Sequence, residues 1–317
     1  MRLRRSLATP PWRSMTRQLR RSAIPPSSMM RCVSLVARAR TYAHEQAHRA
    51  LGAPGGAQPL PRFQQAAFDH LGLPVRYELM DVSPKGLAAA VAALRADPDL
   101  IGANVTIPHK ETIGALLDSV TEETTAIGAV NTITRAGSRL VGRNTDVAGL
   151  RGALDALLDG RRTPRAALIL GAGGAARAAV AALVSAAVGQ ISITNRHLRR
   201  AEQVAAAASK TWPHLAIRAV PWHESILVEE AARVGIVINA TSLGLSLKDA
   251  PPLPAAAFRE GQFLIDAVYA PGGTALVRSA RAAGAEAADG LEMLLLQGAA
   301  SFELWTGRPA PIGIMRD

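Results

Sequence analysis

The sequence predicts an α/β protein of two domains, an N-terminal α/β domain followed by a doubly wound α/β domain. Three observations favour this class. The chain of 317 residues is long enough for two domains, and 49% hydrophobic with 4% aromatic residues suits an alanine- and leucine-rich α/β core. Short apolar runs alternate with longer stretches of helical spacing. An apolar strand that ends in a glycine-rich turn opens the second half of the chain.

The net charge of +11 is confined to the start of the chain. Ten arginines precede residue 41, the first acidic residue is Glu45, and the rest of the chain holds 26 basic against 25 acidic residues. The excess positive charge therefore belongs to residues 1–47, which we expect to form a disordered basic leader. Three origins are open for this leader: a transit peptide, a basic arm, or upstream sequence translated from a start codon placed too early. We favour the last, with Met29 or Met30 as the later start.

Membrane insertion and cysteine chemistry are not indicated. No uninterrupted run of about 18 apolar residues is present, so no membrane span is expected. Cys32 is the only cysteine, which excludes an internal disulfide and a cysteine-based metal site and favours a cytoplasmic setting. We expect no metal and no nucleic-acid partner. The sequence does not determine the oligomeric state and leaves a homodimer open.

Regular structure is expected to begin near Pro61. The spacing predicts helices over residues 63–71 and 87–95 and strands over residues 75–80, 101–106, 128–133 and 140–143, with a turn at residues 136–138 between the last two. Pro108 stands where the first turn of a helix tolerates proline. The alternation of strands and helices indicates a parallel sheet in this first domain, which we place at residues 48–147.

The second domain, placed at residues 148–288, begins with a helix over residues 148–158. Strands are predicted at residues 166–170, 190–194, 216–220, 234–239 and 263–268, with helices that include residues 200–208 and 274–283. This is the pattern of a doubly wound Rossmann domain. A C-terminal segment, residues 289–317, contains a predicted helix that we expect to return to the first domain, so that the active site lies between the domains.

The turn after the strand at residues 166–170 matches the G-x-G-x-x-G/A pattern of dinucleotide-binding sites, with Gly171, Gly173 and Ala176. One glycine allows the tight turn, and the other lets the backbone approach the pyrophosphate at the N-terminus of the next helix. Such turns also occur for packing alone. An apolar strand before this turn and an alanine-rich helix after it favour a cofactor site.

The end of the following strand indicates which dinucleotide binds. An acidic residue there would accept the ribose hydroxyls of NAD, whereas this sequence has Asn195 and Arg196, then Arg199 and Arg200. Arg196, with Arg199 or Arg200, can bind the 2′-phosphate of NADP through charge-assisted hydrogen bonds. The alternative is that these arginines are ordinary solvated charges of a helix.

Lys110 and Asp146 are the candidate acid/base residues. Reduction of a ketone by a nicotinamide needs a group that protonates the developing alkoxide, and a lysine ammonium held beside a carboxylate can do so. Spacing alone leaves another interpretation open, in which Lys110 is a surface charge and Asp146 caps the helix that follows it.

Eight segments, taken in order, resemble the shikimate dehydrogenase family. They are residues 102–110, 128–132, 142–146, 171–175, 195–200, 239–244, 266–271 and 289–297. The resemblance extends over residues 52–310. It implies reversible NADPH-dependent reduction of 3-dehydroshikimate to shikimate, a step of aromatic amino acid biosynthesis, with Lys110 as the acid/base group and Asp146 as its partner.

The same resemblance implies which residues contact each ligand. Substrate contacts are implied for Thr106, Asn131, Asp146, Tyr269 and Gln297. Contacts with NADP are implied for Gly171, Ala172, Gly173, Gly174, Ala175, Asn195, Arg196, Arg200, Thr241, Ala267 and Gly290.

One segment departs from the family pattern, which is Gly-x-Pro, an apolar residue and then x-His-Ser-x-Ser-Pro, whose two serines hold the substrate carboxylate. Gly52 and Pro61 keep the register, but Gln58 and Leu60 stand at the serine positions. Leucine cannot form a hydrogen bond, so weaker carboxylate binding is implied. Residues 45–51 also lack the apolar strand that should lead into this segment.

A compensated pair of frameshifts explains the departure. Codons for the family-like string Val-Ala-His-Ser-Leu-Ser, read one base early after a preceding G, give Gly-Gly-Ala-Gln-Pro-Leu, which is the observed sequence of residues 55–60. Coding DNA that reads unambiguously without a shifted frame would remove this hypothesis.

The altered anchor leaves alternatives to shikimate dehydrogenase. One is a relative that acts on quinate or on an aminated analogue with the same lysine and aspartate chemistry. Another is a protein that binds NADP and has lost turnover. A nucleic-acid-binding role rests on the basic leader alone.

Overall fold

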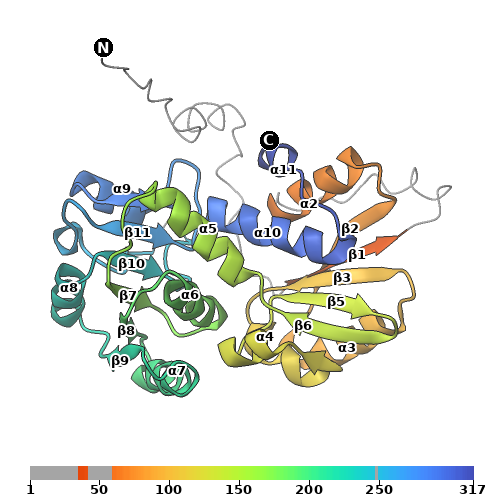
Figure 1. Ribbon diagram of the computed structural model, residues 1–317, viewed down its shortest axis with the longest axis horizontal. Coiled ribbons are helices and arrows are strands. Elements are labelled where there is room, and N and C mark those ends of the chain that lie inside the picture. Colours follow the sequence, from red (N-terminus) through yellow and green to blue (C-terminus); the bar gives the residue numbers. More distant parts are fainter. Residues whose placement is uncertain (1–34, 42–58, 247–248) are drawn as a thin grey trace, which may run out of the picture.

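The computed structural model describes residues 35–41, 59–246 and 249–317 (Figure 1). Two six-stranded sheets form two α/β domains, which confirms the predicted fold class. Helices α5 (Asp146–Leu158) and α10 (Leu291–Thr306) lie between the two sheets (Figure 1). Within the described ranges, no helix has both the length and the apolar character that a membrane span requires.

The first sheet is mixed, with the strand order β2-β1-β3-β5-β6-β4. Its strands are β1 (Leu35–Thr41), β2 (Val75–Asp81), β3 (Leu100–Val105), β4 (Ser119–Val120), β5 (Thr132–Ala136) and β6 (Arg139–Arg143). β1 is antiparallel to β2 and β3, and β5 is antiparallel to β3 and β6. The prediction of a parallel sheet in this domain is therefore wrong. The tight turn between β5 and β6 enforces antiparallel pairing, because parallel neighbours need a long crossover.

Strand β1 lies within the range assigned to the basic leader, so that assignment is wrong for residues 35–41. The segment reads Leu-Val-Ala-Arg-Ala-Arg-Thr, and its alternation of small apolar and basic residues suits a strand even though its arginine content suggested a leader. Ala39 is fully buried. Residues 1–34 and 42–58, which include Gln58 and the missing lead-in strand at residues 45–51, lie outside the described residues.

Short helices connect the strands of the first domain. They are α2 (Pro59–His70), η2 (Pro84–Gly86), α3 (Leu87–Ala96), η3 (His109–Glu111), η4 (Ile113–Leu116) and α4 (Glu122–Ile127). Pro108 precedes the single 3₁₀ turn of η3 and not a full helix. The strand predicted at residues 128–133 begins later, at Thr132, because Gly128 ends α4 in the left-handed conformation with φ 74°.

The second sheet is parallel throughout, with the order β12-β11-β10-β7-β8-β9. Its strands are β7 (Ala166–Leu170), β8 (Gln190–Thr194), β9 (Ala216–Val220), β10 (Ile236–Asn239), β11 (Phe263–Asp266) and β12 (Glu286–Ala288), and its helices are α6 (Gly174–Ser185), α7 (Leu198–Thr211), α8 (Glu224–Arg233), η5 (Ala255–Ala257) and α9 (Ala275–Ala282). The order reverses between β7 and β10, and a doubly wound sheet binds its ligand at the carboxyl ends of the strands at this point.

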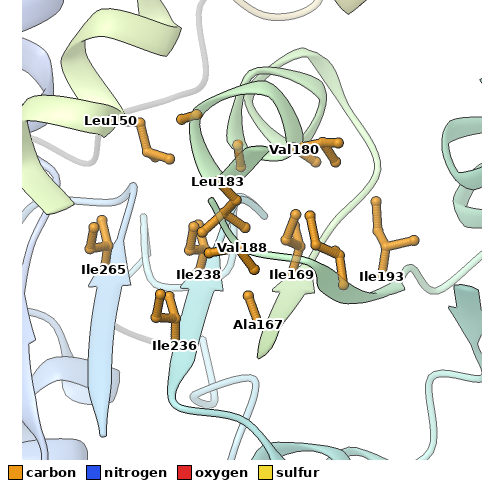
Figure 2. Packing of buried hydrophobic residues seen from close by; sticks show 14 of the residues in the cluster. Leu150, Ala167, Ile169, Val180, Leu183, Val188, Ile193, Ile236, Ile238 and Ile265 are labelled. Carbon is orange, nitrogen blue, oxygen red and sulfur yellow. The ribbon is translucent and has the colours of Figure 1, made fainter. Parts of the chain in front are cut away.

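The core of the second domain holds the glycine-rich turn in place. Ile169 and Ile238 on neighbouring strands pack beneath Val180 and Leu183 of helix α6, and Ile265 lies in the same cluster beneath Leu150 of α5 (Figure 2). All six side chains are at most 1% exposed. Because burial of each such side chain contributes about 1.5–3 kcal/mol, α6 and the turn that leads into it have little freedom to move away from the sheet.

Helix α10 joins the two domains. Near its N-terminus it packs against α5, where a Cβ atom on Gly149 would lie 2.5 Å from the carbonyl oxygen of Met293. Near its C-terminus Trp305 Nε1 donates a hydrogen bond to the carbonyl oxygen of Ile133 in β5, at 2.9 Å. The short helix α11 (Ile312–Arg316) follows it. Contacts at both ends of α10 thus fix the position of the two sheets relative to each other.

We predict that Gly149→Ala destabilises the protein, by about 1–3 kcal/mol, because the added methyl group meets backbone atoms of α10 that cannot move aside. Gly313→Ala is the matched control: it is also a helical glycine, but nothing lies within 4 Å of its Cβ position. Urea unfolding of both variants measures the difference. Equal or smaller loss of stability in Gly149→Ala would contradict the close packing of α5 on α10.

Candidate active site

Lys110 and Asp146 form an ion pair at the boundary between the domains. Lys110 lies in η3, directly after strand β3, and Asp146 is the first residue of α5. Lys110 Nζ lies 2.6 Å from Asp146 Oδ2, and the two side chains are only 15% and 4% exposed. Asp146 does not act as the helix cap, since Thr145 takes that position. The arrangement holds a charged ammonium in one place with little water around it.

Asn131 connects this ion pair to the C-terminal helix. Asn131 Nδ2 donates to Asp146 Oδ1 at 2.8 Å and to Gln297 Oε1 of α10 at 3.2 Å. All three side chains are buried. Four residues expected at the site from sequence, counting Lys110, are therefore brought together from four different segments of the chain.

A buried chain of hydrogen bonds extends from Asn131 away from the ion pair. Asn131 Oδ1 accepts from the hydroxyl of Thr132, which also bonds the hydroxyl of Ser301 in α10. Ser301 Oγ in turn accepts from Asn104 Nδ2, and Asn104 Oδ1 accepts from the hydroxyl of Tyr77 at 2.8 Å. Sequence reasoning assigned none of these four residues a role. Asn104 and Thr132 lie within motif segments, whereas Ser301 and Tyr77 are linked to the site only through the fold.

Two further predicted substrate residues, Thr106 and Tyr269, form no hydrogen bond with the ion pair among the described residues. Thr106 is exposed at the carboxyl end of β3, and its carbonyl oxygen accepts from the backbone N–H of His109. Tyr269 is partly buried after β11, and this burial raises the pKa of its hydroxyl.

The glycine-rich turn packs directly against the ion pair. Gly171 adopts φ 108°, and a Cβ there would lie 2.8 Å from the carbonyl oxygen of Ala240. A Cβ on Gly174 would lie 2.9 Å from Lys110 Cβ. No side chain caps α6, so the first backbone N–H groups of that helix, from Gly174 onward, remain available to an anion. The residues 171–175 could therefore hold a pyrophosphate.

The predicted 2′-phosphate residues lie together at the carboxyl end of β8. Arg196, Arg199 and Arg200 are all exposed, and Asn195 Nδ2 donates to the carbonyl oxygen of His197. Arg200 Nη2 donates to Glu111 Oε1 at 2.8 Å, so this arginine already has a partner in the first domain. Sequence reasoning did not identify Glu111.

A buried aspartate at the end of β11, Asp266, holds the loops that follow β10 and β11. Asp266 accepts hydrogen bonds from Asn239 Nδ2 at 2.8 Å and from Thr274 Oγ1 at 2.6 Å. Asn239 Oδ1 in turn accepts from the backbone N–H and the hydroxyl of Thr241. Burial raises the pKa of the Asp266 carboxyl to about 6, although these hydrogen bonds oppose the shift.

Gly290 brings the start of α10 to the same place. A Cβ on Gly290 would overlap the carbonyl group of Ala267, and the Gly290 N–H donates to the carbonyl oxygen of Val268. Gly290 thus lies against the loop after β11, and Thr241 lies in the loop after β10, beside Gly171. Contact of Thr241, Ala267 and Gly290 with one cofactor stays a prediction. No group of three metal-binding side chains is present among the residues that the structure describes.

Protein-family models match three parts of the chain. The shikimate dehydrogenase substrate binding domain matches residues 52–133. The shikimate / quinate 5-dehydrogenase model matches residues 158–248, and the shikimate 5′-dehydrogenase C-terminal domain matches residues 290–317.

Individual proteins match over most of their length. The NADP(+) shikimate dehydrogenase of Moorella thermoacetica is 42% identical over 270 residues, which are 84% of this chain and 89% of that protein. The structure of shikimate 5-dehydrogenase from Thermus thermophilus with NADP(H) and shikimate is 37% identical with a TM-score of 0.72, covering 82% of this chain and 92% of that one. A 5-ketofructose reductase of Gluconobacter is 33% identical with a TM-score of 0.71, covering 83% and 94%.

The raised pKa of Asp266 predicts a pH-dependent contribution to stability. Because the folded protein binds this proton more tightly than the unfolded chain, the contribution is fully present below about pH 4 and is lost as the pH rises through about 6. We therefore expect the free energy of unfolding of wild type, measured in urea relative to that of Asp266→Asn, to fall as the pH rises from 4 to 7. The total fall should be up to roughly 3 kcal/mol. A difference independent of pH would contradict the shift.

Proposed function

The chain belongs to the shikimate dehydrogenase family, and on this premise we propose that it catalyses the reversible NADPH-dependent reduction of 3-dehydroshikimate to shikimate in aromatic amino acid biosynthesis. The observation that carries the proposal is the position of the Lys110 and Asp146 ion pair. It lies directly against Gly174 of the dinucleotide turn, so a proton donor and a bound nicotinamide could both reach the carbonyl group of one substrate.

Lys110 provides the proton in this reaction. Its ammonium donates a proton to the substrate oxygen during reduction, and its amine takes the proton back from the hydroxyl during oxidation. Asp146 holds Nζ at 2.6 Å and stabilises its positive charge, which restricts the ammonium to one position. NADPH, when bound, supplies the hydride.

Asn131 and Gln297 are proposed to bind substrate hydroxyls. Both amides are buried: Asn131 donates a hydrogen bond to Asp146 directly, and Gln297 accepts one from Asn131. Thr106 and Tyr269 are proposed at the edge of the same site, with Tyr269 on the side of the substrate carboxylate. Loss of one buried polar contact of this kind should weaken substrate binding by about 1–3 kcal/mol.

The residues that would hold NADP are those of the glycine-rich turn and the β8 loop. Residues 171–175 leave the backbone open to the pyrophosphate. Asn195, Arg196 and Arg200 are proposed to bind the 2′-phosphate, and the two arginines are exposed at this loop. Thr241, Ala267 and Gly290 are proposed to line the nicotinamide end. A homodimer and a cytoplasmic location stay predictions from sequence.

The substituted carboxylate anchor favours a second candidate, an enzyme that reduces a ketone other than 3-dehydroshikimate. Gln58 and Leu60 replace the two serines of the family pattern, and the similar 5-ketofructose reductase is named for a substrate that has no carboxylate. Quinate, an aminated analogue of shikimate, and NADP binding without turnover also remain as alternatives. Leu60 lies at the second position of α2, and Gln58 lies outside the described residues.

The main test uses the purified full chain with shikimate and NADP⁺, followed by NADPH absorbance. We predict turnover by wild type, and a loss of roughly 100-fold or more in kcat for Lys110→Ala, because the proton acceptor is removed. Lys85→Ala is the control, since Lys85 is an exposed lysine of the same domain. Wild type that binds NADP⁺ but forms no NADPH from shikimate would contradict the proposed reaction in favour of another substrate or a binding protein without turnover.

The anchor is tested by restoring it. Gln58→Ser combined with Leu60→Ser should lower the KM for shikimate by about tenfold or more while leaving the Kd of NADP⁺ unchanged, because two hydroxyl donors are returned to the carboxylate. The same double variant assayed with 5-ketofructose is the control for substrates without a carboxylate. An unchanged KM for shikimate would show that these two positions do not bind the carboxylate.

A further inference from the structure

Glu111 makes a contact between the domains that the proposed reaction does not use. It follows Lys110 in η3, and its carboxylate is 32% exposed. Oε1 accepts from Arg200 Nη2 at 2.8 Å, and Oε2 lies 3.7 Å from Arg177 Nε. One carboxylate of the first domain therefore lies between two guanidinium groups carried by α6 and α7 of the second.

The carboxylate of Glu111 lies over the dinucleotide turn. A Cβ on Gly173 would lie 3.7 Å from Glu111 Oε1, and the neighbouring Gly174 packs on Lys110. Arg177 belongs to the helix that begins at this turn, and its buried Nε has no hydrogen-bond partner. Glu111 thus adds a negative charge at a place where a dinucleotide brings its phosphates.

Arg200 is the residue that a 2′-phosphate and Glu111 would both require. The Arg200 side chain is 48% exposed, so a phosphate can reach it from solvent. A phosphate at this guanidinium would have to replace the carboxylate or lie beside it, and two negative groups that close together repel each other. The ribose hydroxyl of NAD, which is neutral, does not meet this repulsion.

We propose that Glu111 is a specificity-determining residue for the cofactor: it competes with the 2′-phosphate for Arg200 and so sets how strongly the protein prefers NADP over NAD. The proposal rests on the proposed function, which assigns Arg200 to the 2′-phosphate. Glu111 belongs to the first domain and Arg200 to the second. A phosphate that replaces Glu111 at Arg200 therefore also breaks a contact between the domains.

The test measures binding of NADP⁺ and NAD⁺ to the full chain by calorimetry, without substrate. These ligands differ only by the 2′-phosphate. Glu111→Gln should raise the ratio of the NAD⁺ Kd to the NADP⁺ Kd about threefold to tenfold, and less at high salt. Asp69→Asn, which removes an exposed carboxylate of helix α2 in the same domain that bonds Gln65, should leave the ratio within about twofold of wild type.

A second background separates this effect from a general loosening of the domains. In Arg200→Gln, the further change Glu111→Gln should alter the ratio much less than it does in wild type, because the guanidinium for which the two groups compete is absent. An unchanged ratio in Glu111→Gln, when wild type itself prefers NADP⁺, would overturn the inference. If neither wild type nor Glu111→Gln binds NADP⁺ more tightly than NAD⁺, the assignment of the 2′-phosphate site within the proposed function would instead be contradicted.

Discussion

The buried ion pair between Lys110 and Asp146 is the constraint on which the rest of the site depends. A carboxylate that is 4% exposed is costly unless its oxygens are paired, and here one oxygen accepts from Lys110 and the other from Asn131. The position of Asp146 at the start of α5 adds the favourable field of a helix N-terminus. The ion pair, the hydrogen-bond chain behind it and the start of α5 therefore stabilise one another.

Helix α5 connects the ion pair to α10 and to the second domain. α5 begins at the ion pair and packs on α10 at Gly149, and α10 in turn contributes Gln297 and Ser301 to the polar chain. Because Gly174 lies against Lys110 and Gly290 against Ala267, small changes at these glycines would move the cofactor turn relative to the proton donor. The absence of side chains at these two positions is thus a condition for bringing hydride and proton transfer to one substrate.

The motifs predicted the parts of the site that lie close together in sequence. Gly171 to Ala175 and Asp146 could be placed because a strand before or a helix after them has a clear apolar period. Contacts that depend on packing could not: Asn104 bonds Ser301 across 197 residues, and Arg200 bonds Glu111 across 89. The antiparallel strand β1 was missed for a related reason, since its arginines resemble a leader until Ala39 is seen buried in the sheet.

The dependence of catalysis on this ion pair is measured most directly by the steady-state oxidation of shikimate by Asp146→Asn, with the Kd of NADP⁺ measured on the same preparation. An asparagine keeps the shape of the side chain and removes the charge that holds the Lys110 ammonium. We expect a fall in kcat of roughly 100-fold with an unchanged Kd for NADP⁺. A kcat equal to that of wild type would show that catalysis does not depend on this ion pair.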